Sequence, residues 1–182
     1  YASPRLNLSN ESVIGLWTFD EGNASDLSNY GNDGTCTNFP QTGKCNVTEG
    51  KIGKGIQFDG INDHVNLSRL PQLEGTNLSF SVTLWAKYIG GTQRLLFIYD
   101  ADDAGDTSDI YMYWTSSNAI NYQTGGLTSE QASSITDLTD NRWHLIGLVR
   151  DNTAAQTRVY EDGVLKNSVS DDGSTFTNAY TF

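Results

Sequence analysis

The sequence predicts an all-β protein folded as a two-sheet antiparallel sandwich. Short runs in which apolar and polar residues alternate predict about eleven or twelve strands. Turns rich in Asp, Asn and Gly separate these runs, and aromatic residues lie at strand ends, which is typical of β-sandwiches. The 182 residues suffice for one domain with a sizeable core. No long window shows sustained helical periodicity.

The first strand is expected at Val13–Phe19, where alternate residues form a strongly apolar face. A polar turn, Ser28–Gly34, follows it. Two further short strands are expected at Gly55–Gly60 and His64–Leu67. The rest of the domain is expected to be organised around this segment.

The second half of the chain carries longer alternating runs. Leu78–Tyr88 predicts a long strand with one core face, because its even positions are mostly apolar and its odd positions mostly polar. A helical turn is expected at Ser129–Ser133, and Glu161-Asp162-Gly163 predicts a tight hairpin turn. The remaining strands are expected at Arg94–Tyr99, Ile110–Thr115, Ala119–Gln123, Arg142–Arg150, Thr157–Tyr160, Val164–Val169 and Ser174–Phe182.

Composition excludes several kinds of partner. The net charge is −11, which argues against nucleic acid and against an anionic membrane surface. No apolar run approaches the roughly 20 residues of a membrane helix, so we expect no membrane insertion of this chain. The chain starts with Tyr1, which indicates processing or trimming. The polar residues 1–12 are expected to form an arm or linker that precedes a domain at residues 13–182.

Two features indicate an extracellular or cell-surface location. Cys36 and Cys45 flank a turn, the layout of a disulfide that staples a hairpin, although a redox pair or half a metal site is the alternative. Six Asn-x-Ser/Thr sequons lie within the first 79 residues and predict an N-glycosylated chain. Their asparagines are Asn7, Asn10, Asn23, Asn46, Asn66 and Asn77.

A series of short motifs, in this order and spacing, resembles the laminin-G-like jelly roll of the concanavalin A-like lectin/glucanase superfamily. The resemblance covers residues 13–182 and implies a jelly-roll sandwich. It says little about function, because this fold carries lectins, adhesion modules, glycanases and inert spacers. The motifs are Gly15–Gly22, Asn29–Thr35, Gly50–Gly60, Asp63–Val65, Phe80–Trp85, Trp143–Leu145 and Tyr160–Val164.

The resemblance also implies a closing strand beside the first one, and this strand is absent before Phe182. Either the chain has been cut, or the closing strand comes from elsewhere. An open apolar sheet edge promotes aggregation, so something is expected to cover it. The arm at residues 1–12 of another copy could add a strand there, since Leu6 and Leu8 alternate with polar residues.

A calcium site is one candidate for cofactor chemistry. The resemblance implies a structural Ca²⁺ near the first turn, at Asp20 and Asn32, where carboxylate and amide oxygens suit a hard cation. The alternative is that both side chains simply bond turn amides. The acidic stretch Asp100–Asp109 departs from the EF-hand pattern, because Ala104 offers no oxygen and Tyr111 replaces the bidentate Glu. A solvated acidic loop is the interpretation favoured there, with a non-standard Ca²⁺ site as the alternative.

Catalysis is not indicated. Glycosidases need two carboxylates about 5–10 Å apart, and no two Glu residues are paired on a predicted strand. His64 and His144 lie in strands and are interpreted as packing or hydrogen-bonding residues. An aromatic cluster at Tyr111, Tyr113, Trp114 and Tyr122 is interpreted as core or sheet-face packing, with a glycan platform as the alternative.

Two functional hypotheses follow. The first is a non-catalytic extracellular binding or adhesion module whose partner is a glycan or an extracellular protein. The second is a structural subunit of a surface filament that polymerises with copies of itself through the N-terminal arm.

Overall fold

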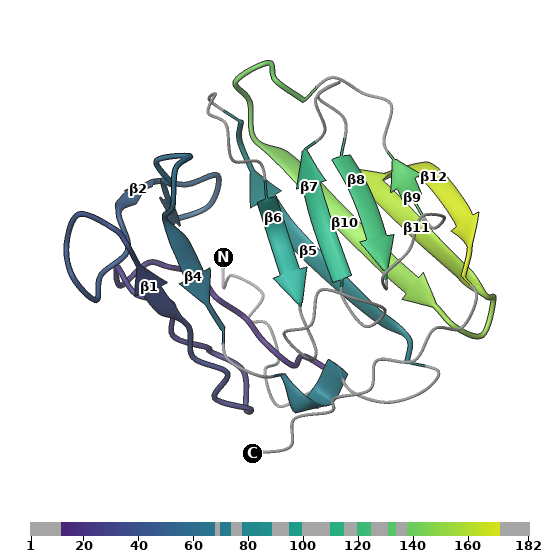
Figure 1. Ribbon diagram of the computed structural model, residues 1–182, viewed down its shortest axis with the longest axis horizontal. Coiled ribbons are helices and arrows are strands. Elements are labelled where there is room, and N and C mark those ends of the chain that lie inside the picture. The colour runs from purple at the N-terminus through teal and green to yellow at the C-terminus, as the bar shows by residue number, and fades with distance from the viewer. Residues whose placement is uncertain are drawn as a thin grey trace, which may run out of the picture. The chain divides into compact units, whose positions relative to one another are not determined.

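The computed structural model describes residues 12–67, 70–73, 78–88, 95–99, 110–114, 120–124, 131–133 and 138–171. The chain forms two compact units, residues 1–72 and 73–182. Figure 1 shows antiparallel strands throughout, with a single 3-10 turn, η1 (Pro71–Leu73), among the described residues. Within these ranges, no helix has the length and apolar character that a membrane span requires.

The first unit contains two small sheets of very short strands. β1 (Thr35–Thr37) pairs antiparallel with β4 (His64–Asn66). β2 (Val47–Glu49) pairs antiparallel with β3 (Lys54–Ile56). The predicted strands near residues 55–60 and 64–67 are thus present in shortened form.

The prediction that Val13–Phe19 is a strand is wrong, because no strand is assigned there. Side chains and loops bond its backbone in place of a neighbouring strand. The amide of Leu16 donates to Asp26 Oδ1 at 2.8 Å, and its carbonyl accepts from the Leu27 amide at 2.9 Å. Turn residues therefore supply the hydrogen bonds that this backbone would form with a neighbouring strand in a sheet.

The core of the first unit is small and includes the predicted disulfide. Cys36 and Cys45 are joined, with their Cα atoms 5.2 Å apart. They are buried with Ala24 and Phe39, and four partly buried side chains pack against them: Trp17, Phe19, Ile56 and Val65. Aromatic rings thus supply much of the apolar area in this core.

The second unit is built on a four-stranded sheet of longer strands. Its order is β12-β11-β10-β5, and each neighbouring pair is antiparallel. Along β5, burial alternates residue by residue, as the sequence predicts. The strands are β5 (Phe80–Ala86), β10 (His144–Asp151), β11 (Gln156–Glu161) and β12 (Val164–Ser170).

A second four-stranded sheet has the order β6-β7-β8-β9. β9 occupies the place of the predicted helical turn at Ser129–Ser133, and this prediction is wrong because the segment pairs with β8. β9 lies close to β11 and β12 of the first sheet. The strands are β6 (Leu95–Tyr99), β7 (Ile110–Trp114), β8 (Ile120–Thr124) and β9 (Gln131–Ser133).

The predicted all-β antiparallel fold is confirmed, and the helix-free sheets are those of a jelly-roll sandwich. Met112 and Tyr122 lie opposite each other on β7 and β8, and both are buried. Ile146, Leu148 and Val159 form the buried face of the β5–β12 sheet. The predicted strand at Ser174–Phe182 lies outside the described residues.

A charged pair is buried on that same face. Arg150 of β10 donates two hydrogen bonds to Asp171, which follows β12, at 2.6 and 3.0 Å. The hydroxyl of Thr157 donates to the same carboxylate at 3.1 Å. The pair thus connects the two strands that flank β11.

Candidate functional site

The solvent-facing side of the β5–β12 sheet, here called the outer face, is the surface best suited to binding. Its side chains alternate with the buried ones, and the strand register sets them in rows. Thr83, Gly147 and Tyr160 form one row across three strands. The outer face consists of Ser79, Ser81, Thr83, Trp85, Leu145, Gly147, Val149, Asp151, Arg158 and Tyr160.

One end of the outer face is aromatic. Trp85 lies opposite Leu145 and is 37% exposed, although most large aromatic residues in a sheet pack inward. Trp143 precedes β10, and the Lys87 ammonium lies 5.7 Å from the centre of its ring. Such a contact orients an ammonium over an indole ring. This end thus offers aromatic surface with a cation beside it.

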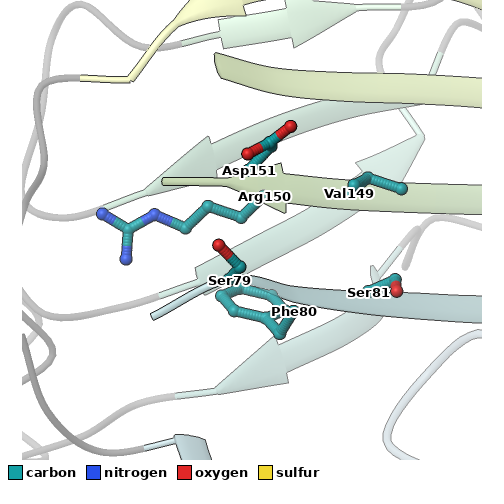
Figure 2. A pocket seen from close by; sticks show the side chains of 6 residues that line it. All are labelled: Ser79, Phe80, Ser81, Val149, Arg150 and Asp151. Carbon is teal, nitrogen blue, oxygen red and sulfur yellow. The ribbon is translucent and has the colours of Figure 1, made fainter. Parts of the chain in front are cut away.

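The other end of the outer face is polar and hollowed. A shallow hollow of about 230 Å³ lies between β5 and β10 (Figure 2). It is lined by Ser79, Phe80, Ser81, Val149, Arg150 and Asp151. The Ser79 hydroxyl accepts a hydrogen bond from the Asn152 amide at 3.0 Å, which fixes its position. Hydroxyl and carboxylate groups thus lie beside an apolar wall.

Arg158 forms a charge pair with Asp151, one of the residues that line the hollow. Arg158 donates to Asp151 Oδ2 at 3.1 Å and twice to Gln156 Oε1, at 3.1 and 2.7 Å. The Ala154 amide, followed by the Arg158 guanidinium, lowers the pKa of the Asp151 carboxyl. The carboxylate is therefore ionised at neutral pH and serves as a hydrogen-bond acceptor.

Gly147 separates the aromatic end from the polar end. A methyl group at this position would lie 3.4 Å from Cβ of Tyr160 and 3.8 Å from Cγ2 of Thr83, both ordinary contact distances. The fold therefore tolerates alanine here, although Gly147 itself is buried between its neighbours in the row.

The predicted calcium residues contact turns. Asp20 Oδ1 accepts from the Lys54 amide at 2.8 Å, beside Gly53, where any Cβ would collide with that oxygen. The Asn32 side-chain amide donates to the Ile14 carbonyl at 2.6 Å, and the backbone carbonyl of Asn32 accepts from the Trp17 indole at 2.9 Å. The bond of Asp20 matches the turn-amide alternative, whereas the Asn32 side chain bonds a backbone carbonyl, and the calcium site stays a prediction.

Asp26 is the residue that sequence reasoning missed in this region. Its carboxylate accepts from the amides of Leu16, Ser28 and Asn32 and from the Ser28 hydroxyl, at 2.6–2.8 Å. Burial raises the pKa of Asp26, but these hydrogen bonds outweigh it and lower the pKa below its usual value. The Asp-x-Ser spacing of an Asx turn was the available signal.

The remaining predicted sites are partly described. Asn23, Asn46 and Asn66 are exposed, as glycosylation requires, and their modification stays a prediction. Tyr122 is buried, in agreement with the packing interpretation of the aromatic cluster. The predicted sites that lie outside the described residues are Asn7, Asn10, Asn77, the loop Asp100–Asp109 and the side chains of Tyr111, Tyr113 and Trp114.

Comparison with protein families gives one match in sequence. The profile of a family described as the concanavalin A-like lectin/glucanases superfamily matches residues 59–182, which agrees with the resemblance noted above. The match includes every strand of the outer face. No curated protein sequence matches the chain.

Two solved structures are similar in fold. The first is domain 4 of AbnA, a GH43 extracellular arabinanase from Geobacillus stearothermophilus, in complex with arabinotriose. It has a TM-score of 0.65 and 24% identity, over 91% of this chain and 79% of that one. The second is the binding domain of Paraclostridial Mosquitocidal Protein 1, with a TM-score of 0.61 and 13% identity. That alignment covers 88% of this chain and 41% of the other.

Proposed function

Because the chain belongs to the concanavalin A-like lectin/glucanases superfamily, we propose that it is a non-catalytic module that binds a glycan on the outer face. The superfamily contains both binding and hydrolytic proteins, so membership alone does not distinguish them. The side chains on the outer face favour binding over hydrolysis.

The observation that carries the proposal is the exposure of Trp85 at one end of the outer face, with a hollow lined by hydroxyl and carboxylate groups at the other end. The C–H groups on one face of a sugar ring pack against an indole, while its hydroxyls need hydrogen-bond partners. Trp85 supplies the first kind of contact. Ser81 and Asp151 supply the second, on the far side of Gly147.

A neutral oligosaccharide is the ligand class that fits best. The net charge of −11 repels polyanionic glycans. Arg158 is already bonded to Asp151 and Gln156, so its charge is committed within the protein. The arabinotriose bound to the similar arabinanase domain is a neutral oligosaccharide of this kind. The Cys36–Cys45 disulfide supports an extracellular location.

A binding role is preferred over hydrolysis on chemical grounds. A glycosidase needs two carboxylates across the scissile bond. Among the described residues of the outer face, Asp151 is the one carboxylate, and it is bonded to Arg158. The filament hypothesis concerns the arm at residues 1–12, of which the structure describes Ser12 alone, and it stays a prediction.

The test is a glycan array probed with the 182-residue chain, followed by calorimetry on the best oligosaccharide. The Trp85→Ala variant is expected to lose about tenfold in affinity, because an aromatic contact contributes about 0.5–1.5 kcal/mol beyond the area that it buries.

Ile61→Ala is the matched control, since Ile61 is an apolar residue of the first unit that is 70% exposed. It is expected to bind like the parent chain. Equal affinity of the parent and Trp85→Ala would contradict the proposed face, and an array without any bound glycan would contradict glycan binding. A repeat with a chelator tests the Ca²⁺ prediction at Asp20 and Asn32.

A further inference from the structure

A histidine and three carboxylates converge at the turn between β11 and β12, away from the outer-face hollow. His144 Nδ1 lies 2.9 Å from Asp162 Oδ2 and 4.0 Å from Glu161 Oε1. One ligand atom from each of these three residues lies within 4.8 Å of the others. Asp162 and Gly163 both have positive φ, as a tight two-residue hairpin turn requires, so the turn holds Asp162 beside the start of β10.

Asp140 fixes the orientation of the imidazole ring. Its Oδ1 lies 3.0 Å from His144 Nε2, on the side of the ring opposite Asp162. An ionised carboxylate only accepts hydrogen bonds, so a ring nitrogen that faces one must carry a proton to bond it. Nε2 faces Asp140 in this way, and Nδ1 faces Asp162 at hydrogen-bond distance. This arrangement requires a positive species at Nδ1, either a proton or a metal ion.

Glu161 supplies a second, independent observation. Its side chain is 6% exposed, and among the residues that the structure describes Oε2 has no hydrogen-bond partner. The nearest described cation is Lys166, whose Nζ lies 3.8 Å from that oxygen, beyond hydrogen-bond distance. A buried carboxylate is costly unless it is paired or bound to a metal. Glu161 thus faces His144 with Oε1, while Oε2 is ion-paired with Lys166 and accepts no hydrogen bond from the described residues.

The separations are near those of a tetrahedral metal site without matching them. With bonds of about 2.0–2.2 Å to nitrogen and oxygen, neighbouring ligand atoms in a zinc site lie about 3.4 Å apart. For a metal to bind, the hydrogen-bonded pair at 2.9 Å must open, and the wider separations, 4.0 Å and at most 4.8 Å, must close. An imidazole ligand favours first-row transition metals over Ca²⁺ and Mg²⁺. Asp140 has the position of the outer carboxylate that orients a metal-binding histidine.

We propose that His144 Nδ1, Glu161 and Asp162 form a Zn²⁺ site, with Asp140 as the residue that positions the imidazole. Zinc takes the place of the proton on Nδ1, and a water completes the tetrahedron. The Lys166 ammonium opposes the ion electrostatically, and removal of its charge is expected to strengthen binding. The site ties the start of β10 to the β11–β12 turn and is separate from the calcium prediction at Asp20 and Asn32.

The test is calorimetric titration of the tag-free, chelator-treated 182-residue chain with ZnCl₂ near neutral pH. One Zn²⁺ per chain is expected, with release of about one proton from the imidazole, measured in buffers of different ionisation enthalpy. Ca²⁺ at the same concentration is expected to give no saturable heat at this site. Glu161→Gln and Asp162→Asn are each expected to weaken binding at least tenfold.

His64→Gln is the matched control, because His64 is the other histidine and is exposed. It is expected to bind zinc like the parent chain, whereas His144→Gln is expected to lose binding. The proposal is overturned if the parent chain binds no zinc, or if Glu161→Gln and His144→Gln keep the parent affinity. Glu161→Gln preserves side-chain shape, so it separates loss of a ligand from loss of folding. No glycan is used, so the outcome is independent of the proposed function.

Discussion

The two units of the chain are stabilised in different ways. The described part of the first unit has four strands of three residues each, whereas β5, β10, β11 and β12 of the second have six to eight. In the first unit, side chains such as Asp26 bond the backbone, and a disulfide adds a covalent link. In the second unit, neighbouring strands bond each other's backbone. The buried Arg150–Asp171 pair joins β10 to the residue after β12.

Similar sequence patterns thus lead to different sources of stability in the two units. Both units contain Asp-rich turns and alternating apolar residues. In the first unit, hydrogen bonds from a few polar side chains hold loops that bury little apolar surface. In the second, registered ladders bury complete side chains such as Ile146 and Leu148. Substitutions at these anchors should therefore affect one unit and spare the other.

The largest effect is expected at Asp171. Asp171→Ala leaves the Arg150 guanidinium buried without its carboxylate, which costs about 3–5 kcal/mol. Urea denaturation measures the loss, and amide hydrogen exchange should localise it to residues 73–182. The double variant Arg150→Met, Asp171→Leu should recover most of the stability, because it removes both charges. A loss below 1 kcal/mol in Asp171→Ala would show that the pair contributes little.

The disulfide should give the next largest effect. Replacement of Cys36 and Cys45 by alanine releases a loop whose ends are nine residues apart, which costs about 2–3 kcal/mol in the chain-entropy estimate. Faster hydrogen exchange is expected in residues 12–67, with unchanged exchange in β10 and β11. Equal acceleration in both units would contradict the division between them.

A smaller, pH-dependent effect is expected at Asp26. Asp26→Asn converts an acceptor of four hydrogen bonds into a group that also carries donors, at a cost of about 1–2 kcal/mol near pH 7. The folded-state pKa of Asp26 is lowered from 3.8. Its contribution is therefore complete above the unfolded pKa and is lost as the pH falls through the folded one. Denaturation at pH 7 and below pH 3 checks whether the difference between parent and variant disappears.

Asp59→Asn is the control for Asp26. Asp59 also accepts hydrogen bonds from backbone amides, those of Ile61, Asn62 and Asp63, but it is exposed. Water can replace these bonds, so the variant should be nearly as stable as the parent at pH 7. A loss as large as that of Asp26→Asn would show that burial does not distinguish the two carboxylates.

The sequence predicted those parts of the fold that depend on local pattern. Alternation along Leu78–Tyr88 gave β5 with the correct faces, and the Asp-Gly pair gave the turn between β11 and β12. Ser129–Ser133 was assigned to the wrong class, because a three-residue strand defined by pairing with β8 has too little local pattern. Val13–Phe19 has a strand pattern, but its hydrogen-bond partners are turn side chains.

The sites were harder to predict, because they depend on contacts between distant residues. Asp26 lies among several Asp and Asn residues, and only the folded turn selects it as the common acceptor. Trp85 is one of four tryptophans, and its exposure follows from the parity of its position in β5. His144 was expected to be hydrogen-bonded, and it is, but its carboxylate partners come from residues 140 and 162. Sequence alone does not bring these residues together.

The buried pair between Arg150 and Asp171 has a consequence for folding fidelity. Neighbouring strands can also pair one residue out of step, which would turn every side chain to the opposite face. Such a slip in β10 would expel Arg150 to solvent and leave Asp171 buried beside Thr157 without a counter-ion. A misaligned sheet therefore contains an unpaired buried charge, which raises its free energy. Apolar side chains can replace one another, so their contacts distinguish the correct register less strongly. Asp171 follows the last described strand, so the aligned arrangement is secured only after β10, β11 and β12 have all been made.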